Sequence, residues 1–207
     1  MIIEKKITLI LHPGRPVEAR IVELTGQLID TKMADAWWGD DSLKATFTSS
    51  PIDRRWNWSA REIEYEGRLL RSVKVAAVTG EGEESAVQGA MMISTEPVPS
   101  VLEPGKACLF VELLFTAPRN RPDLRRDGQP FVIGDGSQLL SYGAWLSQEN
   151  NLDGRLRLDG SPDFVGWYAK RGLQKLDTDP IVYEGVAYTP MELPAAAAQE
   201  LLAAWGE

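Results

Sequence analysis

Apolar and polar residues alternate in several short runs of the chain, with the period of two that a β-strand requires. Residues 5–12 ("KKITLILH") and 16–24 ("PVEARIVEL") alternate on either side of a "PGR" turn and predict a first hairpin. Residues 72–80 ("SVKVAAVTG") and 85–96 ("SAVQGAMMISTE") predict two further strands joined by the acidic turn "EGEE". Shorter strand-like runs follow at 154–160 and 181–193.

Residues 107–117 ("ACLFVELLFTA") are apolar on both faces except for Glu112, as is typical of a central strand. Five segments carry helical periodicity or helix-end signals: 30–41, 59–70, 136–151, 161–172 and 194–205. In the fourth we expect Ser161 at the N-cap, Pro162 in the first turn and Gly172 just past the end. This order of strands and helices predicts a mixed α/β fold.

Composition narrows the class of protein. The 207 residues are 43% hydrophobic and 25% charged, which fits one globular domain with a real core. The net charge of -8 disfavours broad binding to nucleic acid. The N-terminus lacks the pattern of a signal peptide, and no apolar run is long enough to span a bilayer. We therefore expect a cytoplasmic protein.

Cysteine and histidine are almost absent. The single Cys108 excludes an intramolecular disulfide and a cysteine metal cluster, so no metal is expected. The single His12 lies beside a predicted turn, "ILHPGRP", where we read it as structural rather than catalytic. Nucleophilic catalysis through a histidine base has little support in this chain.

Two glycines precede the helix expected after residue 134, in "GDGSQLL". Such a pair has two interpretations, a tight turn or a cradle for an anion. Unpaired N–H groups and the positive dipole end at a helix start favour a phosphate, and glycines let the backbone approach it. Alone, the glycine pair is more typical of a plain turn; a cradle here would be made by Gly134, Gly136 and Ser137 with the amide of Gln138.

From about residue 107 to 173 the chain resembles the GNAT superfamily of acetyl-CoA-dependent N-acyltransferases. "LLFTAPRNR" is similar to the end of that family's fourth strand and its V-x-P-x-x-R signature, with Thr116, Pro118 and Arg121 at the matching places. "GDGSQLL" is similar to its pyrophosphate loop, and "WYAKRGL" to the F-Y-x-x-x-G-F ending of its fourth helix. Residues 1–60 carry no such resemblance.

The resemblance implies a single GNAT-like domain over residues 1–207, with a central, mixed, mostly antiparallel sheet flanked by helices. It implies that the pantetheine arm of acetyl-CoA pairs with the backbone of Leu114, Phe115 and Thr116. Arg121 and Ser161 are the further donor-binding residues that the match assigns. No metal is implied.

The match departs from the family pattern in four places. Phe131 stands where a Gln or Arg usually begins the phosphate loop, and Val132 where a glycine is common. About ten extra residues precede that loop, in which Arg125 or Arg126 could replace the missing cation or be solvated charges. Asp135 places a carboxylate between the two glycines, which suits a pyrophosphate only if it points to solvent. Ser161 stands where the family often has Asn.

Two residues are the catalytic candidates. The resemblance makes Tyr168 the acid that protonates the departing thiolate, with aromatic packing beside Phe164 and Trp167 as the alternative. Glu112, a lone carboxylate in an apolar strand, is costly to bury without a partner or a cleft. It could accept the proton of the attacking amine, or it could form a salt bridge.

The sequence therefore predicts transfer of an acetyl group from acetyl-CoA to a primary amine by direct attack, with the acceptor undetermined. Two alternatives remain open: a non-catalytic GNAT-like acyl-CoA-binding or interaction module, and a toxin-type enzyme acting on aminoacyl-tRNA. Oligomeric state is not predicted. Four tryptophans, which are read as packing residues or as the lining of an acceptor site, are Trp37, Trp38, Trp56 and Trp58.

Overall fold

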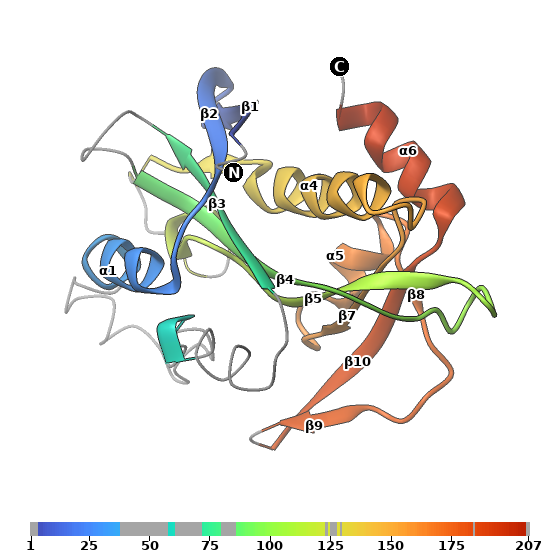
Figure 1. The fold of residues 1–207 in the computed structure, drawn as a ribbon. Coiled ribbons are helices and arrows are strands. Elements are labelled where there is room, and N and C mark those ends of the chain that lie inside the picture. Colours follow the sequence, from blue (N-terminus) through green and yellow to red (C-terminus); the bar gives the residue numbers. More distant parts are fainter. Residues whose placement is uncertain are drawn as a thin grey trace. The chain divides into compact units, whose positions relative to one another are not determined.

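The computed structural model describes residues 4–37, 58–60, 72–79, 86–122, 124, 128, 130–183 and 185–205. The described strands are β1 (Lys5–Leu11), β2 (Arg15–Glu23), β3 (Ser72–Thr79), β4 (Ala86–Pro99), β5 (Ala107–Thr116), β6 (Val132–Ile133), β7 (Leu156–Gly160), β8 (Gln174–Lys175), β9 (Ile181–Tyr183) and β10 (Val186–Leu193). The helices are α1 (Gly26–Trp37), the 3-10 turn η3 (Pro118–Asn120), α4 (Asp135–Glu149), α5 (Val165–Ala169) and α6 (Ala195–Trp205) (Figure 1).

Strand pairing follows the order β6-β1-β2-β3-β4-β5-β7-β10-β8, with β9 paired to β10. The pairs β1–β2, β1–β6, β2–β3, β7–β10, β8–β10 and β9–β10 are antiparallel, and β5–β7 is parallel. The predicted mixed, mostly antiparallel sheet with flanking helices is confirmed. The run 107–117 is a strand between two others, as its apolar pattern predicted.

The chain divides into two compact units, each built from two separate stretches. The first unit comprises Met1–Met92 and Leu113–Leu139, and the second comprises Ile93–Glu112 and Leu140–Glu207. The strands β4 and β5 and the helix α4 each contribute residues to both units. The expectation of one domain over residues 1–207 stays a prediction.

In the first unit, the predicted hairpin forms because β1 and β2 pair in register from Lys5↔Ile21 to Leu11↔Arg15. The core residues of this unit are apolar and almost wholly enclosed: Ile29, Trp58, Ala76, Val78, Val87, Ala90, Met92, Leu113 and Ala117. Trp58 is fully buried, so for this residue the packing interpretation is correct. The side chains of Trp37, Trp38 and Trp56, like the rest of the helix expected at 59–70, lie outside the described residues.

The carboxylate of Asp30, on α1, binds the described residues Trp58 and Ser59. Asp30 accepts the backbone N–H groups of Trp58 (2.8 Å) and Ser59 (2.9 Å), and also the Ser59 hydroxyl. A carboxylate from α1 therefore satisfies these N–H groups, which sequence periodicity does not reveal.

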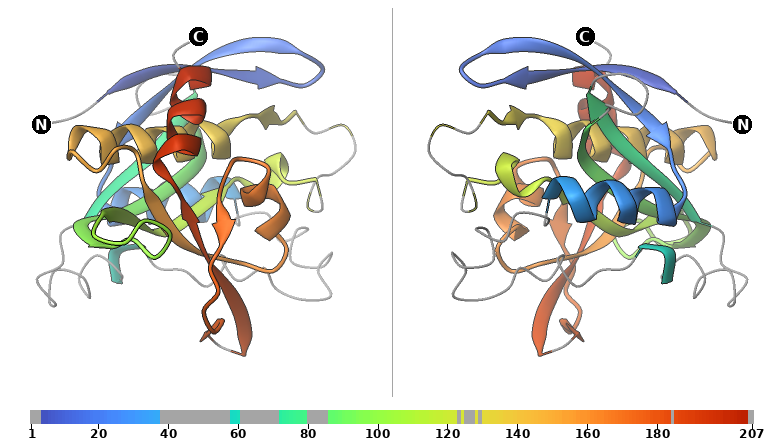
Figure 2. Two further views of the ribbon diagram at one scale, coloured as in Figure 1. Left: turned by 90° about the vertical axis from the view of Figure 1, so that its right-hand side faces the viewer. Right: turned by 90° about the vertical axis from the view of Figure 1, so that its left-hand side faces the viewer.

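In the second unit, α6 packs closely because small residues meet. Gly154 and Gly172 have positive φ values of 81° and 91°, and a Cβ built on either would lie 2.7 Å from Ala198 Cβ or Ala197 Cβ. The α4 and α6 helices also share an aromatic cluster of Tyr142, Trp145 and Trp205, with ring centroids 5.3 to 6.4 Å apart. The β9–β10 hairpin projects from this unit (Figure 2).

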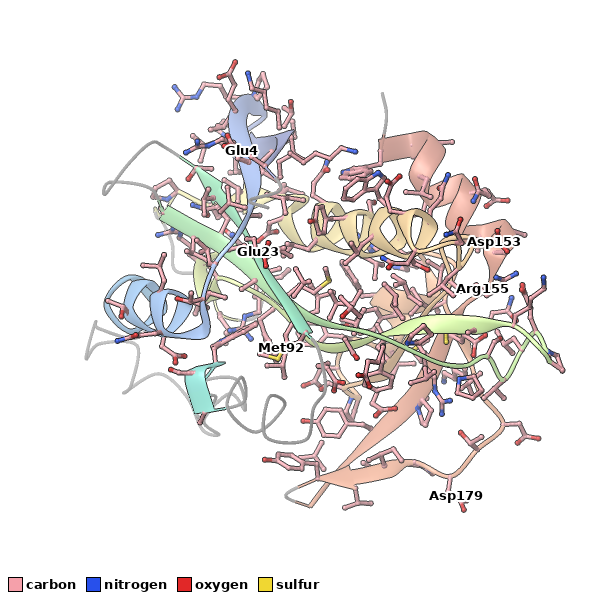
Figure 3. The ribbon with its side chains drawn as sticks, viewed as in Figure 1. Glu4, Glu23, Met92, Asp153, Arg155 and Asp179 are labelled. Atoms are coloured by element: carbon pink, nitrogen blue, oxygen red, sulfur yellow. The ribbon has the colours of Figure 1, made fainter. Side chains whose placement is uncertain are left out.

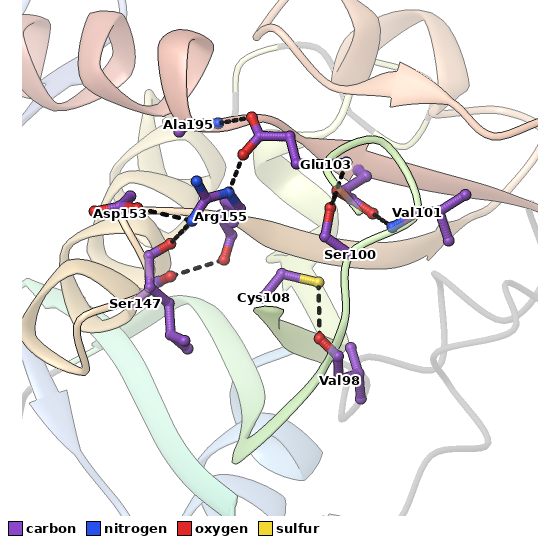
Figure 4. Close-up of polar contacts among 11 residues, drawn as sticks. Val98, Ser100, Val101, Glu103, Cys108, Ser147, Asp153, Arg155 and Ala195 are labelled. Atoms are coloured by element: carbon purple, nitrogen blue, oxygen red, sulfur yellow. Dashed lines mark hydrogen bonds and ion pairs between the residues drawn. The ribbon is translucent and has the colours of Figure 1, made fainter. Parts of the chain in front are cut away.

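A polar network fixes the turn before β7, where Asp153 and Arg155 lie together (Figure 3). Arg155, only 5% exposed, donates from Nη1 to Asp153 Oδ2 at 2.9 Å and from Nε to the Glu103 carboxylate. The other oxygen of Glu103 accepts the N–H of Ala195, at the start of α6, at 3.1 Å (Figure 4). The network therefore joins the β4–β5 turn to the starts of β7 and α6.

A second buried carboxylate, Glu192 on β10, holds the same β4–β5 turn. It accepts the hydroxyl of Ser100 and the backbone N–H of Val101, the latter at 2.9 Å. The proline-rich stretch 98–106 is thus an ordered turn, and its first two residues still belong to β4.

Candidate active site

The start of α4 lies in the first unit, after the two-residue strand β6. Gly134 has φ +101°, a conformation that favours glycine, and a Cβ built on it meets no atom within 4 Å. Open space therefore adjoins the backbone at the place where the sequence predicts an anion. Gly136 is buried, whereas Ser137 and Gln138 are partly exposed.

The residues that depart from the family pattern have a structural role here. Phe131 stacks on His12, with ring centroids 4.6 Å apart, and its carbonyl accepts the His12 N–H at 2.9 Å. Val132 and Ile133 pair with β1. The segment that the family uses to begin a phosphate loop is therefore part of the sheet in this chain.

A pyrophosphate site here would require the Asp135 side chain to point to solvent, but it points inward. Its carboxylate is 5% exposed and accepts Asn120 Nδ2 at 2.9 Å. Burial raises the pKa of this carboxyl to about 6, against the opposing effect of the Asn120 hydrogen bond and of Arg119.

The backbone N–H groups at the start of α4 are therefore not equally available to a ligand. The N–H of Gln138 donates to the Gly134 carbonyl at 2.8 Å, as the first bond of the helix. The glycine conformation fits a phosphate, but the N–H group of Gln138 is already used inside the helix.

Asn120 is a site residue that the sequence did not single out. Its amide oxygen accepts the N–H of Val132 at 2.9 Å, and its amide nitrogen also donates to the Gln88 carbonyl at 3.1 Å. Arg121, the neighbouring residue that the resemblance assigns to the donor, is 6% exposed. The only available signal was a polar residue in the turn after a buried strand. Arg125 and Arg126 lie outside the described residues.

The end of β5 carries Leu114, Phe115 and Thr116, all partly exposed, whereas Cys108 to Val111 are mostly buried. A Cβ built on Gly89 of β4 would lie 2.9 Å from the Phe115 carbonyl oxygen and 3.0 Å from Leu139 Cδ1. Only glycine at position 89 lets β4, β5 and the first turn of α4 approach this closely.

The parallel ladder between β5 and β7 is short. It pairs Leu109 with Leu156, Phe110 with Arg157 and Val111 with Leu158. Both strands then continue, β5 to Thr116 and β7 to Gly160, beyond the last pair. The backbone of β5 after Val111 is thus not paired to β7.

Glu112 is partly buried at the point where this ladder ends. Because side chains alternate along a strand, it shares one face with Phe110 and, across the register, with Arg157 and Asp159 of β7. Burial raises the pKa of the Asp159 carboxyl, and Arg157 opposes that shift. Two carboxylates and an arginine therefore occupy this face in the second unit.

Tyr168 is 8% exposed and belongs to α5, in the second unit. Its ring lies edge-on to that of Trp167, with centroids 5.0 Å apart. Burial raises the pKa of the phenol, and Arg171 opposes the shift. The hydroxyl is therefore protonated across the physiological range, as a general acid must be before it acts.

The helix expected at 161–172 is shorter than predicted. It spans Val165–Ala169, with Phe164 rather than Ser161 at the N-cap and no side-chain cap. Ser161 instead begins a turn, because its carbonyl accepts the N–H groups of Phe164 (2.9 Å) and Val165 (3.2 Å). The prediction for Ser161 as a cap was wrong. Gly172 does lie just beyond the helical turns, in the left-handed conformation.

The described residues give little support to cysteine or metal chemistry. Burial raises the pKa of the Cys108 thiol to about 12, so it is not a thiolate nucleophile at neutral pH. Among the described residues no group of three His, Cys, Asp or Glu side chains could hold a metal ion. No described helix has the length and apolar character needed to cross a membrane.

No family model and no curated protein matches this sequence. Solved structures do match. The chain is similar to a bacterial toxin, with 14% identity over 100% of this chain and 97% of that one, at a TM-score of 0.57. It is also similar to an acetyltransferase of the GNAT family from Listeria monocytogenes 4b F2365, with 17% identity over 91% and 100%, at a TM-score of 0.50.

At such identities the likeness describes the fold. That fold is the one of the GNAT N-acetyltransferases, so the resemblance found in the sequence is confirmed at this level. The chain therefore has an acyl-CoA N-acyltransferase fold. The likeness does not identify the acceptor or the chemical step.

Proposed function

We propose that this chain is an N-acyltransferase that moves the acetyl group of acetyl-CoA to a primary amine by direct attack. The observation that supports this best is the early end of the β5–β7 ladder after Val111 and Leu158. Strand backbone that continues beyond its last pair with β7 can meet an extended ligand along that side, and the pantetheine arm has the amide groups to match it.

On this proposal the donor is held by the residues that the resemblance assigns. The backbone of Leu114, Phe115 and Thr116 pairs with pantetheine. The start of α4, with Gly134, Gly136, Ser137 and Gln138, faces the pyrophosphate, and Arg121 supplies positive charge. Ser161 is a further donor contact. The open space beside Gly134 supports this role.

Glu112 and Tyr168 take the acid–base roles. Glu112 accepts a proton from the ammonium group, after which the amine nitrogen forms a bond to the acetyl carbon. The carbon–sulfur bond then breaks, the Tyr168 hydroxyl gives its proton to the departing sulfur, and the second proton that the nitrogen loses on becoming an amide restores the Tyr168 hydroxyl. The protonated state of Tyr168 and the partial burial of Glu112 support these assignments. The proposal treats residues 1–207 as one catalytic domain that works in the cytoplasm.

A second candidate is a GNAT-like module that binds acyl-CoA or a partner without catalysis. Its support is the altered start of α4, where β6 replaces a loop and the Asp135 carboxylate is turned inward to Asn120. The two candidates differ in whether an acetyl group is transferred.

The deciding experiment begins with donor binding. Thermal unfolding is measured with acetyl-CoA, CoA and ATP, and we expect the two CoA species to raise the midpoint and ATP to leave it unchanged. Acetyl transfer is then followed by release of free thiol with a panel of primary amines: polyamines, peptide N-termini, lysine peptides and aminoacyl-tRNA. Binding without transfer to any amine supports the acyl-CoA-binding module. No binding to either CoA species contradicts the acyltransferase and leaves only a partner-binding module.

A further inference from the structure

Strand β7 presents two different faces in the second unit. Leu158 and Gly160 share one face, and α5 packs there, because a Cβ built on Gly160 would lie 3.5 Å from Tyr168 Cδ2. Arg157 and Asp159 lie on the opposite face. Both are partly exposed, whereas the residues that alternate with them are buried. The face opposite α5 is therefore polar and in part accessible.

The neighbouring strand β5 continues this polar face. Phe110 pairs with Arg157, and Glu112 is the next residue of β5 on the same side. Glu112 and Asp159 follow the last pair of the β5–β7 ladder, and Arg157 stands two residues before Asp159, roughly 7 Å along the strand. One arginine and two carboxylates therefore lie together where the ladder ends, and one of these carboxylates is the proposed base.

Arg157 lacks a hydrogen-bond or ion-pair partner among the residues that the structure describes. Its Nε atom is buried and donates to no group. The carboxylate directly opposite on β10, Glu192, already uses one oxygen for the Ser100 hydroxyl and the other for the Val101 N–H. A buried donor without an acceptor is costly, and a guanidinium is suited to bind a carboxylate through two parallel N–H···O bonds. The unused donors of Arg157 therefore point to an anionic group on a ligand.

We propose that this face binds the acceptor and that Arg157 selects a free α-amino acid, whose carboxylate it binds while Glu112 and Asp159 attract the amine. This inference rests on the proposed function, because it names the acceptor of that reaction. A molecule with its ammonium and carboxylate groups on one carbon is short enough to contact both Arg157 and Asp159, whose strand positions are roughly 7 Å apart.

Other amine acceptors fit this face less well. A polyamine suits the two carboxylates, but it leaves Arg157 without an acceptor and places further positive charge beside it. An amine with a phosphate group brings about two negative charges next to Glu112 and Asp159, which repel them. A carboxylate carries a single charge, and the ammonium group beside it offsets that charge for the two acidic residues.

The test extends the panel of amines to free α-amino acids that have a primary amine, each compared with its α-amide. The amide keeps the amine and the side chain but loses the negative charge. Acetyl transfer is followed by release of free thiol, and binding is measured by calorimetry with CoA present. The variants are Arg157→Gln and Arg157→Lys, and Lys175→Gln, which changes an exposed cation on β8, is the matched control.

For at least one amino acid we expect kcat/KM to exceed that of its amide by about 10- to 100-fold, the range of a hydrogen bond between charged groups. Arg157→Gln should abolish this preference while the rate on the amide and the affinity for acetyl-CoA stay unchanged, and Arg157→Lys should keep part of it. Lys175→Gln should behave as the wild type. The readout is the change in the ratio between amino acid and amide, in which differences in the basicity of the two amines cancel.

Two results overturn the inference and leave the proposed function in place: amines are acetylated but no amino acid is preferred to its amide, or a preference persists unchanged in Arg157→Gln. The first result needs no variant, so it counts even if Arg157→Gln fails to fold. If an amino acid binds in preference to its amide and loses that preference in Arg157→Gln, but no acetyl group is transferred, the amino-acid site stands and the proposed function falls. If no amine binds or reacts, both fall.

Discussion

Tyr168 has a buried ring, which suits packing, and a phenol that keeps its proton, which suits an acid. The ring packs against Trp167, and this would be reason enough for an aromatic residue at the position. The hydroxyl is what distinguishes a packing residue from an acid, so the decisive change removes the hydroxyl alone.

We expect Tyr168→Phe to lower turnover by roughly 10- to 1000-fold, the range of a general acid, while acetyl-CoA affinity barely changes. Steady-state kinetics and calorimetry measure the two quantities. Tyr183→Phe, on the exposed strand β9, is the matched control. Equal turnover for Tyr168→Phe and the wild type would mean that Tyr168 only packs.

Glu112 shares its strand face with a second carboxylate, Asp159. If Glu112 takes the proton of the ammonium, Glu112→Gln should cut turnover by about 100-fold, and higher pH should restore part of it because the amine then arrives deprotonated. The pH–rate profile of Glu112→Gln is compared with that of Asp159→Asn. A larger loss for Asp159→Asn would transfer the role of base to Asp159.

At the scale of elements, alternation predicted the β1–β2 hairpin because each of its strands buries one face, and a continuous apolar run predicted β5 because it lies between two other strands. The β1–β2 hairpin and the central β5 agree with the pattern. The helix predicted at 161–172 is shorter in the structure because Ser161 and Pro162 can begin a turn as readily as a helix. The N–H groups of residues 164 and 165 donate to the Ser161 carbonyl and form that turn. Local sequence cannot report that choice.

The candidate site was predictable only where it depends on local chemistry. The glycine before α4 has the conformation that its place in the sequence suggested. The inward orientation of Asp135 was not predictable, because it depends on Asn120 and Gln88, which come from a different turn and a different strand. The positions of these two side chains have to be known before the orientation of the carboxylate can be predicted.

The packing of α6 depends on two glycines that accept its alanines. In Gly154→Ala the new Cβ would lie 2.7 Å from Ala198 Cβ, at a φ of +81°. Overpacking and backbone strain together should lower the free energy of unfolding by about 2–4 kcal/mol. Urea denaturation measures this loss. Gly166→Ala, inside α5, is the control, because a Cβ built there meets no described atom within 4 Å. It should be neutral or stabilising by up to about 1 kcal/mol. Equal effects in the two variants would contradict the account.

At the scale of the whole molecule, the contacts of Glu103 connect parts of the second unit that are far apart in sequence. The Arg155 hydrogen bond is the main reason that the pKa of Glu103 is lowered. A carboxyl with a lowered folded-state pKa stabilises the protein above its unfolded-state pKa, and this contribution disappears as the pH falls through the folded-state value.

Glu103→Gln should therefore lower the free energy of unfolding by about 1–2 kcal/mol at pH 7. Since the wild type loses the same contribution in acid, the difference should shrink as the pH falls below about 4. Thermal and urea unfolding across pH 3 to 7 measure it. The exposed Glu200→Gln is the control, and a difference that stays constant over this range would show that the charge of Glu103 is not what matters.

The turn between β4 and β5 also has a consequence for the order in which the chain acquires its structure. Ser100 and Glu103 find their partners Glu192 and Ala195 at a separation of 92 residues. A ribosome adding about 5–20 residues per second makes those partners roughly 5 to 18 s after the turn itself. The first unit, whose last residue is Leu139, is by then fully synthesised. Nascent chains should thus protect the first unit from protease while the β4–β5 turn is still cleavable.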